Sequence, residues 1–151
     1  MKFGRPVRWR GRLAAAVALV GAATFARADS PRQDYVTHCM GCHGPGGTGV
    51  PGKVPALRDT LPAFARTSEG RAFVLSVPGA SNSSLSDAEL AAVMTWLLER
   101  FAADDASVPQ HVFTEAEVST HRRPPLSKVR EARSAVLRNL AGTGPVPAED
   151  Y

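Results

Sequence analysis

The clearest helical pattern in the chain covers residues 86–101. Ser86 and Glu89 have the spacing of a capping box, which predicts the start of a helix. After this cap, apolar residues recur at the spacing of one helix face: Leu90, Val93, Met94, Leu97, Leu98 and Phe101. Trp96 lies beside this face, so we expect the helix to pack against more than one element.

Two shorter segments before it also have helical patterns. Ser30 and Pro31 form an N-cap and first-turn pair, which predicts a helix over about residues 31–41. Another helix opens near Ser68 and ends at the Pro-Gly pair 78–79. Between them, GPGGTGVPGKVPAL (residues 44–57) is predicted to be a loop, because its glycines and prolines cannot continue a helix. No alternating stretch predicts a strand, so we expect a small all-α fold.

Helical patterns continue after residue 103. Thr114 and Glu117 form a second capping box, and Pro124 ends that helix. A further helix stops at Gly142 and has these apolar residues at helical spacing: Val129, Ala132, Val136, Leu137 and Leu140. Six basic residues predict either a solvated face of this helical extension or a docking patch for an acidic partner: Arg122, Arg123, Lys128, Arg130, Arg133 and Arg138.

Residues 1–28 have the composition of a secretory signal peptide. A basic start is followed by an apolar run over 13–26 and by Ala-Arg-Ala, which predicts cleavage after Ala28. The apolar run is shorter than the roughly 20 residues that span a bilayer as a helix. We therefore expect export to a periplasm and no stable membrane insertion after cleavage.

Cleavage changes the charge of the protein. The full chain has 18 basic and 14 acidic residues, and six of the basic residues but no acidic residue lie in 1–28. The remaining chain has 12 basic and 14 acidic residues, a net charge of −2. No basic stripe suited to nucleic acid remains, so we expect no nucleic-acid partner.

Both cysteines of the chain lie in one motif, CMGCH, formed by Cys39, Cys42 and His43. C-x-x-C-H is the pattern of c-type haem attachment. Two thiols at this spacing can each add to a vinyl group of haem, and the adjacent histidine can bind the iron. If the helical turn persists, all three side chains project to the same side.

Three other interpretations of the motif remain. The cysteines could form a structural disulfide in an oxidising compartment or serve as a redox dithiol. A redox dithiol is expected beside a βαβ pattern, which the sequence lacks. A zinc site could use His38 with Cys39, Cys42 and His43, but four ligands within six residues are crowded. We favour haem attachment.

With this motif, the chain resembles class I cytochromes c over about residues 33–101. The resemblance follows the order of a helix into CMGCH, the GPGGTG loop, VPAL (54–57) and a last amphipathic helix with Trp96. The stretch VPGASNSSLSDAELAAVMTWLLERF is also similar to periplasmic monohaem cytochromes that accompany quinoprotein dehydrogenases. The family implies one covalent haem c in a small helical fold, attached at Cys39 and Cys42, with His43 as an axial iron ligand.

The sequence departs from that family at the sixth iron ligand. The family usually takes it from a methionine in the loop before the last helix, but here this loop, VPGASNSSLS (77–86), has neither methionine nor histidine. Met94, His111 and His121 are the remaining candidates. Each also has an ordinary interpretation, Met94 as a core residue and the histidines as surface residues.

Together these observations predict four segments. They are a signal peptide (1–28), a cytochrome c domain (29–103), a helical C-terminal extension (104–141) and a disordered tail (142–151). The predicted function is one-electron transfer between a periplasmic dehydrogenase and an acceptor, and not enzymatic catalysis. The alternative is a haem protein whose vacant distal position binds a gas or peroxide.

Overall fold

The computed structural model describes residues 30–102 and 112–148, together with Met1. The predicted signal peptide after Met1, His111 and the last three residues lie outside this description. The described residues form eight helices and no sheet, which confirms the predicted all-α class. Their single β contact is an isolated bridge between Val50 and Val54.

The helix predicted for residues 31–41 is divided in two at the first cysteine. α1 covers Pro31–His38 and α2 covers Met40–His43. Ser30 caps α1 as predicted, since its side chain accepts a hydrogen bond from the Gln33 amide. Cys39 separates the two helices with φ −123°, outside the helical range.

α3, Leu57–Phe64, is a helix that the sequence pattern did not predict. Its first residue belongs to the predicted Gly/Pro-rich loop, and Pro62 lies inside the helix, where proline is usually unfavourable. Leu57, Leu61 and Phe64 nevertheless have helical spacing, and Leu61 and Phe64 are fully buried. Burial of this apolar face therefore outweighs the cost of the proline.

The next two helices agree with the predicted start and stop. α4 covers Ser68–Ser76, and the hydroxyl of Thr67 caps its first turn. The Pro-Gly pair ends α4, but it also begins the short helix α5, Pro78–Ser81. Proline fits the first turn of a helix because its missing N–H is not needed there.

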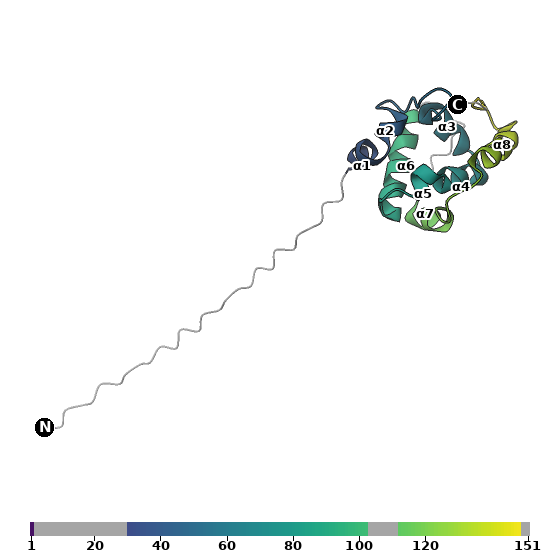
Figure 1. Cartoon of the computed structure of the whole chain (residues 1–151). Coiled ribbons are helices and arrows are strands. Elements are labelled where there is room, and N and C mark those ends of the chain that lie inside the picture. The colour runs from purple at the N-terminus through teal and green to yellow at the C-terminus, as the bar shows by residue number, and fades with distance from the viewer. Residues whose placement is uncertain (2–29, 103–111, 149–151) are drawn as a thin grey trace.

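α6, Asp87–Phe101, lies at the centre of the helical arrangement and confirms the strongest sequence prediction (Figure 1). Both halves of the Ser86–Glu89 capping box are formed. The helix packs against α1, α3 and α7, so it contacts several elements as expected. Its apolar face is buried at Leu90, Val93, Met94, Leu97 and Leu98, and Phe101 is half-buried.

The C-terminal extension packs against the rest of the fold. α7 covers Glu115–His121 and contacts α4 and α6, and α8 covers Val129–Leu140 and contacts α3 and α4. Figure 1 shows α7 beside α4 and α5, with α8 at the other side of α4. Val118 and Leu140 are fully buried, so the two extension helices contribute to the same core.

Two further observations concern membrane spanning and the C-terminal tail. None of the described helices has the length and apolar composition needed to cross a membrane. The predicted disordered tail remains a prediction. Within its described part, the carbonyl groups of Pro145 and Ala148 accept hydrogen bonds from Arg66 and Arg133.

Candidate functional site

The CMGCH motif forms one helical turn with two free thiols. The amides of Cys42 and His43 donate to the carbonyl oxygen of Cys39 over 3.2 and 3.0 Å, so the turn continues through the motif. Cys39 is half-buried and Cys42 is exposed, and neither forms a disulfide. This arrangement places both sulfur atoms where a group bound at the surface of the fold can reach them.

The imidazole of His43 is oriented by a backbone carbonyl. Its Nδ1 atom lies 3.2 Å from the carbonyl oxygen of Pro55. A carbonyl oxygen only accepts, so Nδ1 carries the proton and Nε2 keeps the lone pair that can bind a metal. Burial lowers the pKa of His43, although the bond to Pro55 acts in the opposite direction. The ring therefore favours the neutral form that coordinates metals.

The loop after α2 holds Pro55 in this position. Gly49 has φ +65°, and its amide donates to the carbonyl oxygen of His43 over 3.0 Å. A Cβ atom at Gly49 would meet the carbonyl oxygens of Val54 and Pro55. Only glycine therefore allows this close approach, which places the loop's end against the His43 ring.

Tyr35 of α1 joins the motif to the core. Its hydroxyl donates to the carbonyl oxygen of Gly44 over 2.5 Å, and its ring lies 5.7 Å from that of Trp96, centroid to centroid. Tyr35 is 3% exposed, and burial raises its pKa. Because Gly44 directly follows His43, this contact fixes the end of α2 against α1 and α6.

One comparison with known proteins finds a match in this part of the chain. Residues 26–97 match the family model described as "Cytochrome C oxidase, cbb3-type, subunit III". This part of the chain is a cytochrome c domain. The match covers slightly less than half of the chain and does not reach the C-terminal extension. No curated protein and no solved structure gives a significant match.

A cytochrome c domain with a C-x-x-C pair implies covalent haem c and electron transfer. Such domains are typically extracytoplasmic electron carriers rather than enzymes. The geometry fits the group, because two free thiols and an imidazole with an available Nε2 belong to one helical turn. Among the described residues, no cluster of three or more His, Cys, Asp or Glu side chains could hold a metal ion, so the zinc alternative gains no support.

Two of the three predicted candidates for the sixth ligand, Met94 and His121, lie on described helices, α6 and α7. Met94 is 8% exposed and packs in the core, and His121 is exposed at the end of α7. His38 is also exposed, and its Nδ1 lies 3.5 Å from the hydroxyl of Ser84. His111 lies outside the described residues.

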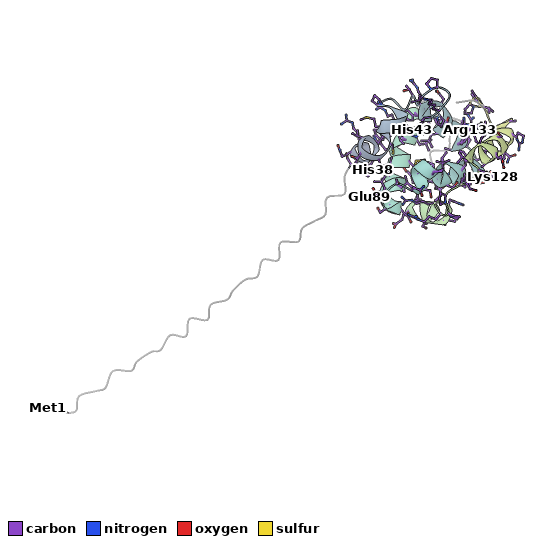
Figure 2. The ribbon with its side chains drawn as sticks, in the orientation of Figure 1. Met1, His38, His43, Glu89, Lys128 and Arg133 are labelled. Carbon is purple, nitrogen blue, oxygen red and sulfur yellow. The ribbon has the colours of Figure 1, made fainter. Side chains whose placement is uncertain are left out.

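The predicted basic face needs a correction. Arg122 and Arg133 are only 2% and 3% exposed, so neither belongs to a solvated face or a docking patch. The guanidinium of Arg122 donates to the buried carbonyl of Ser81, and that of Arg133 donates to the carbonyl of Ala148 in the C-terminal tail, contacts that a linear charge pattern cannot indicate. Figure 2 shows Arg133 and Lys128 in the α8 region, away from His38 and Glu89.

The roles of Tyr35 and Pro55 are not evident from the sequence. Pro55 belongs to the VPAL stretch through which the chain resembles class I cytochromes c. That resemblance does not say which residue Pro55 contacts. The glycine-rich loop that precedes Pro55 indicates that the chain turns back toward the motif at this residue. Tyr35 gives no local indication of its partner, because its contacts with Gly44 and Trp96 depend on tertiary packing.

Proposed function

We propose that the protein is an exported monohaem cytochrome c that carries one electron at a time. Cys39 and Cys42 form the two thioether bonds, and His43 binds the iron through Nε2. When bound, haem supplies an iron that alternates between the ferric and ferrous states. The chain's own residues attach this group, orient the axial imidazole and limit its contact with water.

The observation that carries the proposal is the His43–Pro55 hydrogen bond beside two free thiols. A hydrogen bond to the second ring nitrogen fixes the tautomer and orientation of a metal-binding histidine. The same bond has no evident purpose in a dithiol protein. Together with the C-x-x-C-H spacing, it supports axial ligation by His43.

The partner proposal follows from the exposed cysteine and from the resemblance noted in the sequence. Exposure of Cys42 places one edge of the attached group at the surface, where electrons can pass to another protein. Contacts between redox partners are generally small and short-lived. We assign a periplasmic dehydrogenase as donor because of the similarity to cytochromes that accompany quinoproteins, and export because of the predicted signal peptide.

The second candidate function is binding of a gas or peroxide at a vacant distal position. It is favoured by the loop 77–86, which has no methionine or histidine, and by the core position of Met94. Carbon monoxide added to the reduced protein separates the two functions. Rapid binding supports a vacant position, whereas no binding supports a six-coordinate electron carrier.

The primary proposal is tested by expressing the full chain with a c-type cytochrome maturation system. We expect the exported protein to carry the mass of one haem and to be reduced and reoxidised reversibly. A variant with both Cys39→Ala and Cys42→Ala is the control and should carry no covalent haem. An exported wild-type protein with only the peptide mass would contradict the proposal.

A further inference from the structure

Arg122 follows α7, and its side chain donates five hydrogen bonds. Its guanidinium group is buried, with 2% of the residue exposed. Nε donates to the Ser81 carbonyl over 3.2 Å, and Nη1 donates to the Leu85 carbonyl and the Asp87 carboxylate over 2.7 and 2.8 Å. Nη2 donates to the carbonyl and hydroxyl oxygens of Ser83 over 2.7 and 3.0 Å.

All of these acceptors belong to one segment, residues 81–87, between the end of α5 and the first turn of α6. An arginine has five N–H donors in a fixed planar fork, and here the fork spans three carbonyl groups of the segment. The contact is reciprocal, because the hydroxyl of Ser81 donates to the carbonyl oxygen of Arg122. The conformation of this segment therefore depends on a residue of the extension.

The same segment borders the haem-attachment motif. Ser84 contacts the ring of His38 over 3.5 Å, and His38 directly precedes Cys39. Leu85 is 6% exposed and belongs to the core against which Cys39 and Met40 pack. Residues 81–87 therefore lie beside the segment that carries the first cysteine.

We propose that Arg122 is a positioning residue for the haem site. It holds residues 81–87 against the attachment segment and thereby limits access of external ligands to the iron. The inference rests on the proposed function, since it requires haem attached at Cys39 and Cys42. It also gives the C-terminal extension, which lies outside the cytochrome c match, a role at the redox centre.

The test compares Arg122→Lys with Arg130→Lys in the full-length haem protein. Lysine keeps the charge but cannot span the separated acceptors, whereas Arg130 is exposed on α8 and serves as the matched control. We expect Arg122→Lys to bind imidazole at the ferric iron about tenfold more tightly, because the segment no longer resists opening. Backbone amides of 81–87 should also exchange hydrogen for deuterium about tenfold faster.

A second variant covers the case in which Arg122→Lys does not fold. Ser83→Ala removes only the hydroxyl acceptor and leaves the Ser83 carbonyl bond, so we expect a smaller change in the same direction. Faster amide exchange with unchanged imidazole affinity would show a purely structural role and overturn the inference. Unchanged exchange would overturn it as well. Absence of haem from the wild-type protein would instead contradict the proposed function, while amide exchange would still report on the anchoring.

Discussion

Arg71 of α4 holds the carboxylate of Glu117 on α7 through two hydrogen bonds of 2.6 and 2.7 Å. The Arg71 guanidinium also lies over the ring of Phe113, with its central carbon 3.9 Å from the ring centroid. The two charged side chains are 13% and 21% exposed, so solvent screens their attraction only partly. This pair joins the extension to the cytochrome c domain at a point separate from Arg122.

Loss of this ion pair is expected to destabilise the fold. Glu117→Gln removes the charged acceptor of two hydrogen bonds from the partly buried guanidinium of Arg71. Hydrogen bonds to charged groups contribute about 1.5–3 kcal/mol, so we expect a decrease of about that size in the free energy of unfolding. Chemical denaturation measures it, with exposed Glu99→Gln on α6 as control. Equal stability of the two variants would contradict the prediction.

The same pair predicts a pH dependence of stability. Burial alone raises the pKa of Glu117, but the hydrogen bonds and charge of Arg71 outweigh it and place the pKa below its usual value. A lowered pKa means that the folded state binds this proton less readily than the unfolded state. The stabilisation is complete above the usual glutamate pKa of about 4.3 and is lost as the pH falls through the lowered value.

We therefore expect the wild-type protein to lose more stability in acid than Glu117→Gln does. Denaturation series from neutral pH to below pH 4, about the usual glutamate range, measure this difference. The Glu99→Gln control should follow the wild-type curve. A Glu117→Gln curve parallel to the wild-type curve would show that this carboxylate does not produce the acid sensitivity.

Substitution of Gly49, which closes the loop beside His43, is expected to destabilise the fold more than substitution of an unconstrained glycine. Gly49→Ala places a Cβ at φ +65° against the Val54 carbonyl, so we expect a destabilisation of more than about 1 kcal/mol. Gly79→Ala in α5 is the matched control, because a Cβ there meets nothing within 4 Å. Thermal unfolding of the two variants provides the comparison. An equally small effect at both positions would argue against the tight loop.

A substitution at Met94 distinguishes whether this residue is a core residue or an iron ligand. Its buried position in α6 predicts that Met94→Leu leaves the haem absorption spectrum and reduction potential unchanged. A volume-conserving apolar exchange in a core usually costs less than about 1.5 kcal/mol. Absorption spectra of both oxidation states and a redox titration test this. Loss of a sulfur-ligand band in the variant would instead identify Met94 as the sixth ligand.

Removal of one cysteine and then of both is expected to weaken haem attachment in two steps. Cys42→Ala leaves one thiol at Cys39, so we expect haem held by a single thioether and a shifted absorption band of the pyridine complex. The double alanine variant should release haem on acid-acetone extraction. Retention of colour by the double variant would show that neither sulfur forms the attachment.

Local patterns along the chain determine much of the helical fold. The Ser86–Glu89 capping box and the apolar spacing after it predict α6, and Thr114 and Gly142 bound the extension helices in the same way. These features act between residues three or four positions apart, so the sequence displays them directly. The C-x-x-C-H motif is equally local, and its pattern favours haem attachment over the disulfide, dithiol and zinc interpretations.

Tertiary structure decides the features that depend on distant residues. α3 forms around Pro62 because its apolar face is buried, and Pro55 acts on His43 because the loop returns to α2. The charge pattern assigns Arg122 and Arg133 to a solvated basic face or a docking patch, but packing buries both side chains. A charged side chain is buried when carbonyl and carboxylate groups converge on it. The groups that converge on Arg122 lie 35–41 positions earlier in the chain, a relationship that only the folded structure shows.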